Sequence, residues 1–253
     1  MSLKLYFAPG ACSFVPHCLL ELSGTAYEPQ MVKLHKGEQH GDEYKAINPR
    51  GQVPVLVDDG QVVTQILAII LYLDQKFPHA HFLPTDALAR ARALETLAWM
   101  NNTVHPTFTH IFMPQKFSDQ AEVQAALKVF NTQTYKGLLS ELENIVQRNL
   151  KTAEWLTGPQ LGPVDVYALT LTRWGSIAGI DPTTYPALWS HVQKVAAQAA
   201  VAAVIERERL QLNLFKPPKV GSVWRGLETC GSRCHAGFEF VAGPCKANGE
   251  ART

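Results

Sequence analysis

The period of the apolar residues changes once along the chain, near residue 80. Before that point, short alternating apolar segments typical of β-strands are interleaved with segments of helical period. Beyond it, apolar residues recur at helical spacing and no convincing strand pattern follows. The chain of 253 residues is therefore expected to form a small layer of sheet and helices followed by a helical bundle.

The first part of the chain predicts a mixed sheet flanked by helices. Its expected elements are, in chain order, a strand at 3–8, a helix at 12–22, a strand at 30–34, a short helix at 42–47, strands at 53–57 and 61–64, and a helix at 65–77. Asp58-Asp59-Gly60 between the last two strands is a hairpin signal. The order β-α-β-α-β-β-α is that of the α/β thioredoxin-like fold.

The second part predicts an all-α domain. Helical runs are expected at 86–112, 119–149, 163–178 and 186–212. The predicted domain organisation is a thioredoxin-like domain at 1–78, a linker at 79–85, a helical domain at 86–215 and an atypical tail at 216–253.

The tail, defined as 216–253, lacks helical periodicity and is expected to be poorly ordered. It contains Cys230, Cys234, His235 and Cys245, which are four soft metal ligands. Their spacing matches no standard zinc pattern, so loosely ordered thiols are the favoured interpretation and no metal is expected.

Charge and hydropathy exclude several classes of protein. The formal net charge is +1, which argues against a nucleic-acid or anionic-membrane partner bound through a large field. The apolar run 66–73 is too short to span a membrane. The first residues begin directly in strand-like sequence without a secretory apolar region, so a cytoplasmic location is expected.

Cys12 follows a glycine turn at the expected start of a helix. Unpaired backbone N–H groups and the helix dipole at such a position lower a thiol pKa, and the neighbouring Ser13 hydroxyl can donate to a thiolate. A space-filling residue at the helix start is the alternative. No Cys-x-x-Cys pair is present, because Val15 occupies that position, so a dithiol redox cycle is not expected. Cys18 falls on the apolar stripe and is expected in the core.

Two further features suit a peptide-like ligand. A cis bond between Val53 and Pro54 would turn the Val53 N–H and C=O outward, where an extended peptide can pair with them. Thr64 is a candidate helix cap, and the N–H groups of Gln65 and Ile66 would then bind a carboxylate. An ordinary loop proline and a plain helix cap are the alternatives.

Three motifs, taken in order, resemble the cytosolic glutathione transferases. They are Leu-Tyr-x-x-Pro-Gly-Ala-Cys-Ser at 5–13, Asn-Pro-Arg-Gly-Gln-Val-Pro-Val-Leu at 48–56 and Thr-Gln-x-x-Ala-Ile-x-x-Tyr-Leu at 64–73. The cysteine turn and the following Pro16-His17 are most similar to the bacterial beta class. The resemblance spans about 3–212 and implies the glutathione transferase fold, a homodimer, and an enzyme of detoxification that conjugates glutathione to hydrophobic electrophiles.

The resemblance also assigns roles to residues. Cys12 matches the beta-class cysteine that faces the glutathione sulfur, and Ser13 and His105 complete the expected catalytic set. Val53 would pair with the cysteinyl backbone of glutathione. The full set of expected glutathione-binding residues is Lys36, Gln52, Val53, Pro54, Gln65, Ile66 and Asn102, of which Gln65 would hold the γ-glutamyl group, Lys36 would lie near the glycine carboxylate, and Asn102 would share a helix face with His105.

The reaction implied is attack of a bound thiolate on an electrophilic carbon, or attack of Cys12 on a disulfide. Aromatic and apolar side chains at helical spacing would line a pocket for the second substrate, although such residues also build cores; they are Phe108, Phe112, Met113, Phe117 and Trp174. A same-fold isomerase or reductive dehalogenase is an alternative. A non-catalytic scaffold that binds a protein partner is the alternative from another class.

The sequence departs from the family pattern at several positions. Ile66 stands where a small Ser or Gly is usual, which puts glutathione affinity in question. Phe7 replaces a tyrosine, and strand alternation points Tyr6 to the opposite face. Gly162 replaces the hydroxyl residue of a helix-capping box whose acidic member, Asp165, is kept.

Overall fold

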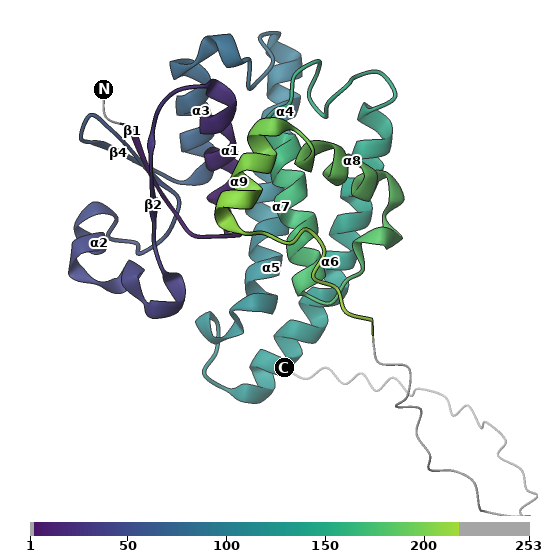
Figure 1. The fold of residues 1–253 in the computed structure, drawn as a ribbon. Helices are drawn as coiled ribbons and strands as arrows, with labels where there is room; N and C mark the ends of the chain where they lie inside the picture. The colour runs from purple at the N-terminus through teal and green to yellow at the C-terminus, as the bar shows by residue number, and fades with distance from the viewer. Residues whose placement is uncertain (1–2, 218–253) are drawn as a thin grey trace, which may run out of the picture. The chain divides into compact units, whose positions relative to one another are not determined.

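The computed structural model of the chain describes residues 3–217, whose elements are drawn in Figure 1. Four strands form one sheet in the order β2-β1-β3-β4. They are β1 (Leu3–Phe7), β2 (Glu28–Met31), β3 (Val55–Asp58) and β4 (Gln61–Thr64). β2 runs parallel to β1, whereas β1 with β3 and β3 with β4 are antiparallel pairs. This is the expected thioredoxin-like sheet.

Alternation along β1 separates the two faces of the sheet. Leu3, Leu5 and Phe7 are buried in the main core, against α1 (Phe14–Ser23) and α3 (Ile66–Lys76). The opposite face carries Tyr6, whose ring packs edge-on against Tyr44 of α2 (Asp42–Ile47) with centroids 5.8 Å apart. Tyr6 therefore points away from α1, as strand alternation predicts.

The rest of the described chain is helical. The helices are α4 (Ala87–Trp99), α5 (His105–Phe112), α6 (Ala121–Asn149), α7 (Pro163–Ile177), α8 (Pro186–Ala196) and α9 (Ala199–Glu208). α7 contacts α1, α4, α5, α6 and α8, so nearly all of its residues are buried. α1 in turn packs against α3, α7 and α9 and is the element through which the two parts of the chain meet (Figure 1).

Several boundaries differ from the expected ones. The helix expected from residue 12 begins at Phe14, because Ala11 and Phe14 donate their N–H groups to Ala8 and Ala11 in consecutive turns. The run expected at 186–212 is two helices, since the backbone of Gln198 is extended and turns the chain between α8 and α9. The run expected at 86–112 is continuous but contains a π-helical segment, Met100–Val104.

The buried carboxylate of Asp165 ties the start of α7 to the segments around it. It accepts hydrogen bonds from the N–H groups of Gly162 at 3.0 Å and Leu156 at 2.9 Å. The same group lies 2.9 Å from Nε2 of the buried His191. A Cβ at position 162 would lie 2.8 Å from the carbonyl oxygen of Phe82, so close packing accounts for glycine where the resemblance predicts a hydroxyl residue.

Within 3–217, none of the helices is long and apolar enough to cross a membrane. Over the same range, no three His, Cys, Asp or Glu side chains gather in an arrangement that would hold a metal ion. The cysteines and histidine considered for zinc, Cys230, Cys234, His235 and Cys245, lie outside the described residues, as does the tail beyond 217.

Candidate active site

Cys12 lies in the turn between β1 and α1, directly opposite the peptide bond before Pro54. Its Sγ lies 3.6 Å from the carbonyl oxygen of Val53 and donates a hydrogen bond to it. The Val53-Pro54 bond is cis, as the sequence predicts. The Cys12 sulfur and the expected peptide-pairing residue, Val53, are thus brought together from segments 41 positions apart.

The pKa of the Cys12 thiol is raised, whereas the sequence predicts a lowered one. Burial raises it to about 12, and the backbone N–H groups of Cys12 and Ser13 lower it by a smaller amount. The prediction that the helix N-terminus gives Cys12 a lowered pKa is therefore wrong for the protein without a ligand. Desolvation of the sulfur outweighs the two amides, so Cys12 is a neutral hydrogen-bond donor at pH 7.

Ser13 does not direct its hydroxyl at the sulfur. Its side chain is fully buried, accepts a hydrogen bond from the N–H of Ala8 at 3.1 Å and donates to the carbonyl oxygen of Ala8 at 3.2 Å. These two bonds close the turn that carries Cys12 and occupy the hydroxyl proton. The expected stabilisation of the Cys12 thiolate by this hydroxyl is corrected accordingly: Ser13 contributes through its backbone N–H and through the shape of the turn.

The start of α3 lies after the hairpin, with Gln65 as the residue preceding the helix. Thr64 is the last residue of β4 and does not cap α3, which corrects the expected cap. Gln65 has φ of 71°, a left-handed backbone that a non-glycine residue adopts at a cost. Ile66 is 5% exposed and its side chain belongs to the main core. Although Ile66 is larger than the Ser or Gly usual at this position, its side chain points into the core and does not cover the N–H groups at the start of α3.

The loop before Val53 is held by the carbonyl group of Gln52. It accepts hydrogen bonds from the Tyr44 hydroxyl and from Nδ2 of Asn48, both at 2.7 Å, while Gln52 is exposed. Lys36 is exposed at the end of a short helical turn after β2, Leu34–Lys36. Gln52 and Lys36 are thus available to a ligand, and Gln52 also fixes the backbone from which Val53 continues.

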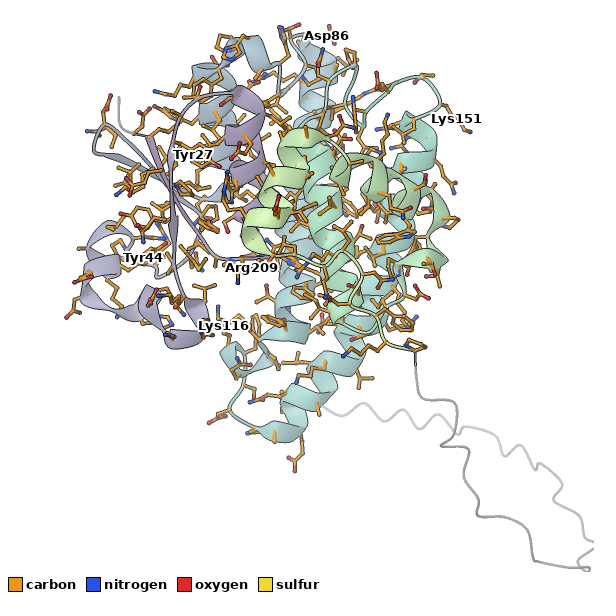
Figure 2. All side chains as sticks on the ribbon, in the orientation of Figure 1. Tyr27, Tyr44, Asp86, Lys116, Lys151 and Arg209 are labelled. Atoms are coloured by element: carbon orange, nitrogen blue, oxygen red, sulfur yellow. The ribbon has the colours of Figure 1, made fainter. Side chains whose placement is uncertain are left out.

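His105 begins α5 directly after the π-helical segment Met100–Val104. Its N–H donates to the carbonyl oxygen of Met100, and the next residue, Pro106, has no N–H to donate. Nδ1 of His105 lies 2.9 Å from the Tyr167 hydroxyl. Burial, assisted by the charge of Lys116, lowers the pKa of His105 to about 4 (Lys116 is labelled in Figure 2). The imidazole is therefore neutral at pH 7.

The π-helical segment changes which asparagine lies beside His105. Asn101 lies next to the hydroxyl of Tyr167, which donates to its Oδ1 at 3.5 Å. Asn102 is exposed and accepts a hydrogen bond from Nδ2 of Asn101 at 2.9 Å. The expected pairing of Asn102 with His105 on one face assumes a regular α-helix; the wider π turn brings Asn101 to that face instead.

Sequence reasoning missed Tyr167. The residue is fully buried in α7, with its hydroxyl between His105 and Asn101. Burial raises the pKa of Tyr167, and the charge that Cys12 would carry as a thiolate raises it further, which reflects the proximity of the two groups. The available signal was a phenol within a continuous apolar helix, because a buried hydroxyl requires a hydrogen-bond partner.

Aromatic rings next to His105 form a stack that reaches from the core to the surface. Phe108 lies between Trp174 and Phe112, with centroid distances of 4.7 and 5.5 Å and interplanar angles of 16° and 13°. Phe108 and Trp174 are buried, whereas Phe112 and Phe117 are 59% and 48% exposed. Two of the residues expected to line a second-substrate pocket are thus core residues, and two present their rings to solvent.

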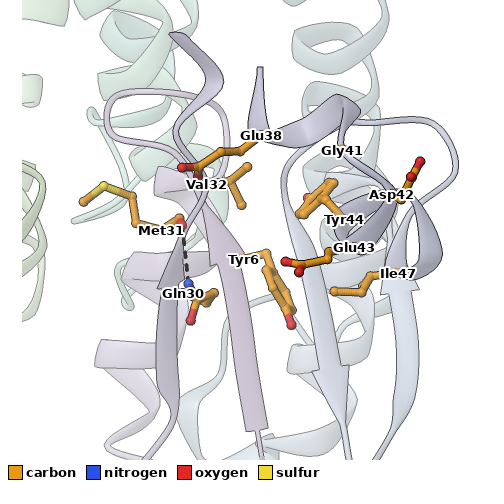
Figure 3. Close-up of a pocket in the computed structure, with 10 residues that line it drawn as sticks. All are labelled: Tyr6, Gln30, Met31, Val32, Glu38, Gly41, Asp42, Glu43, Tyr44 and Ile47. Carbon is orange, nitrogen blue, oxygen red and sulfur yellow. Dashed lines mark hydrogen bonds between the residues drawn. The ribbon is translucent and has the colours of Figure 1, made fainter. Parts of the chain in front are cut away.

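A hollow of about 640 Å³ lies on the face of the sheet that carries Tyr6, opposite to α1. Figure 3 shows the residues that line it. Tyr6, Tyr44 and the carboxylates of Asp42 and Glu43 are among them. None of its lining residues belongs to the expected catalytic or glutathione-binding set. Tyr6 is therefore committed to this face and is separate from the Cys12 site.

Comparison with known proteins gives consistent results. Residues 1–75 match the family model for the N-terminal domain of glutathione S-transferase. A glutathione S-transferase of Xanthomonas campestris pv. campestris is 32% identical over 211 residues, which is 82% of this chain and 100% of the relative.

Two solved structures extend the likeness. A glutathione transferase homologue from Sulfitobacter, with bound glutathione, superposes with a TM-score of 0.77 at 27% identity, covering 83% of this chain and 99% of that one. A bacterial beta-class enzyme from Sphingomonas chungbukensis superposes with a TM-score of 0.70 at 29% identity, covering 82% and 100%. The stretch matched therefore includes both the sheet and the helical part.

Proposed function

Because this chain belongs to the cytosolic glutathione S-transferase family, with bacterial beta-class enzymes among its relatives, we propose that it conjugates glutathione to small hydrophobic electrophiles. The observation that carries the proposal is the 3.6 Å separation between Cys12 Sγ and the Val53 carbonyl oxygen, beside a cis proline. Thiol–disulfide exchange at Cys12 is a second activity of the same site.

The proposed mode of glutathione binding follows from the edge that Val53 offers. The cysteinyl residue of glutathione pairs with the Val53 backbone as a short added strand. Because Cys12 Sγ contacts the same backbone, this pairing brings the thiol of glutathione next to Cys12. Gln65 and the N–H of Ile66 take the γ-glutamyl group at the start of α3. Lys36 and Gln52 lie toward the glycine end, and Asn102 is a further contact.

The proposed chemistry is stabilisation of the glutathione thiolate. The neutral Cys12 thiol and the N–H groups of Cys12 and Ser13 donate hydrogen bonds to a thiolate placed beside them. The thiol proton leaves to solvent, and the thiolate forms a C–S bond with an electrophilic carbon. The carbon either loses its leaving group as an anion to solvent, or belongs to a polarised double bond whose electron pair then takes up a proton from solvent. The raised pKa of Cys12 favours this role over permanent ionisation, so conjugation is the main activity proposed and disulfide exchange the secondary one.

The second substrate is proposed to bind against Phe112, at the exposed end of the aromatic stack, and against the exposed ring of Phe117, which stacks on His110. A homodimer in the cytoplasm is proposed from the family likeness. Val129 and Phe130 of α6 are 75% and 71% exposed, and a second subunit would cover such apolar side chains. Light scattering coupled to gel filtration tests the dimer.

Calorimetric titration with reduced glutathione tests the proposal first. The unmodified protein is expected to bind saturably. Gln65→Ala is expected to weaken binding about tenfold, since a hydrogen bond to a charged group is lost while a non-glycine residue stays at the strained position. Gln61→Ala, at an exposed site on β4, is the matched control and leaves the affinity unchanged.

Absence of binding to the unmodified protein would overturn the proposal and favour a scaffold that keeps only the fold. Equal weakening by Gln65→Ala and Gln61→Ala would overturn the assignment of the γ-glutamyl site while leaving glutathione as the substrate.

A further inference from the structure

Both backbone polar groups of Gly10, two residues before Cys12, are bonded to side chains of the helical part of the chain. The N–H of Gly10 donates to Oε2 of Glu208 at 2.8 Å, and its carbonyl oxygen accepts from Nε1 of Trp174 at 2.8 Å. Gly10 has φ of 70°, and a Cβ there would lie 2.7 Å from a guanidinium nitrogen of Arg173. Side chains of α7 and α9 thus hold the turn that carries Cys12 by hydrogen bonds.

Glu208 is itself held in place by buried partners. It is 4% exposed, and its second oxygen lies 2.7 Å from Nδ1 of the fully buried His17. Nε2 of His17 lies 3.1 Å from a guanidinium nitrogen of Arg207, which also bonds the Glu21 carboxylate and, at 2.7 Å, the hydroxyl of Tyr27 (labelled in Figure 2). The carboxylate facing Gly10 therefore has little freedom to move.

Trp174 is fixed on its other side by aromatic rings. It is 5% exposed, lies nearly parallel to Phe108 and meets the ring of His105 with centroids 4.7 Å apart. Its indole N–H is therefore held toward Gly10 by packing that a phenylalanine at the same position would largely keep.

We propose that Glu208 and Trp174 are positioning residues that orient the Gly10 peptide groups so that the N–H groups of Cys12 and Ser13 face the Cys12 sulfur. Each residue acts through the turn, by its hydrogen bond to Gly10. The inference deepens the proposed function, on which it rests for the identity of Cys12 as the residue that meets the substrate. If it holds, the reactivity of the Cys12 thiol depends on α9, which carries Glu208.

The test measures alkylation of Cys12 by iodoacetamide, without glutathione, across a range of pH. Site-resolved mass spectrometry separates Cys12 from the other cysteines. Trp174→Phe removes the indole N–H and keeps a ring, and Glu208→Gln removes the charge and keeps the shape. Each is expected to slow Cys12 alkylation about three- to tenfold and to displace the pH profile upward, because the N–H groups of Cys12 and Ser13 then stabilise the thiolate less well.

Two matched controls separate positioning from general loss of packing. Trp155→Phe replaces another buried indole. Glu143→Gln replaces another buried carboxylate that accepts two backbone N–H groups, those of Ala187 and Leu188. Both controls are expected to keep the Cys12 rate within about twofold. The double variant Trp174→Phe with Glu208→Gln is expected to lose less than the product of the single losses, because both act on one peptide.

Unchanged or faster alkylation in folded variants would overturn the proposal, and so would equal slowing in the controls. If Glu208→Gln does not fold, Trp174→Phe decides the question alone. The assay contains no glutathione, so a failure to bind glutathione in the calorimeter overturns the proposed function without altering this result.

Discussion

The thiol of Cys12 donates a hydrogen bond to the carbonyl oxygen of Val53, at a separation of 3.6 Å. A donor must carry its proton, so this contact and the raised pKa of the thiol describe the same neutral state. The contact also places the sulfur at the strand edge where an extended peptide would add. The contact with Val53 thus sets the position of the Cys12 sulfur, and its burial keeps the thiol protonated.

The first prediction concerns the ionisation of Cys12 in the protein without a ligand. Because burial raises its pKa to about 12, the alkylation rate of Cys12 should increase with pH from neutrality to about pH 10 without levelling off. Quenching the alkylation at successive times and quantifying labelled Cys12 by site-resolved mass spectrometry gives the rate at each pH. A plateau between about pH 6 and 8 would show an already ionised thiol and contradict it.

The second prediction separates two activities at one site. Cys12→Ala removes the sulfur that bonds the Val53 carbonyl oxygen, so reduction of a glutathione mixed disulfide should fall more than about a hundredfold. Conjugation, which uses the sulfur of glutathione, should fall less than about tenfold, by loss of one hydrogen bond. Cys18→Ala, at a fully buried core position, is the control and should keep both activities in the folded protein. Equal loss of both activities in Cys12→Ala would argue against this division.

The third prediction concerns acid stability. The pKa of His105 is about 4 in the folded protein because burial disfavours the charged ring, whereas an unfolded chain has the ordinary value near 6.5. The unfolded state therefore binds more protons between these values, and stability is lost as pH falls from about 6.5 to about 4.

Relative to His105→Gln, which does not titrate, the unmodified protein should lose about 2–3 kcal/mol of unfolding free energy over that range. Urea unfolding at several pH values measures the difference. A difference between the two proteins that does not change with pH would rule out the depressed pKa.

The fourth prediction contrasts two glycines of the helical part. Gly162→Ser restores the capping hydroxyl of the family pattern, yet its Cβ would lie 2.8 Å from the Phe82 carbonyl oxygen. The substitution should therefore destabilise the protein by about 1–3 kcal/mol instead of stabilising it. Gly137→Ala in α6, where a Cβ meets nothing within 4 Å, should stabilise by about 0.5–1 kcal/mol. Thermal unfolding of the two variants and the unmodified protein measures both changes in stability. A Gly162→Ser variant that is more stable than the unmodified protein would contradict the close approach of position 162 to the Phe82 carbonyl oxygen.

Local pattern and turn chemistry were enough to predict much of this protein. Alternation and helical spacing indicated the order of strands and helices, and they placed Tyr6 and Phe7 on opposite faces and Cys18 in the core. The cis bond at Pro54 was predicted from the turn sequence before a strand, taken together with the expected fold; the edge position expected for this proline was wrong, because Pro54 leads into β3, which lies between β1 and β4. These features depend on neighbours within a few residues, which a sequence displays directly.

Tertiary structure decided the properties that depend on burial and on distant partners. The pKa of Cys12 rose because packing removed water from the sulfur, and the Ser13 hydroxyl turned to Ala8 because it is buried there. Glu208 lies 198 positions from the Gly10 amide that it holds. Periodicity carries no information about such pairs, since each is created only when α1 packs between the sheet and the helices of the second part. The sequence by itself thus determined the fold and pointed to Cys12 as the candidate reactive residue, whereas the tertiary structure decided the protonation and orientation of its thiol.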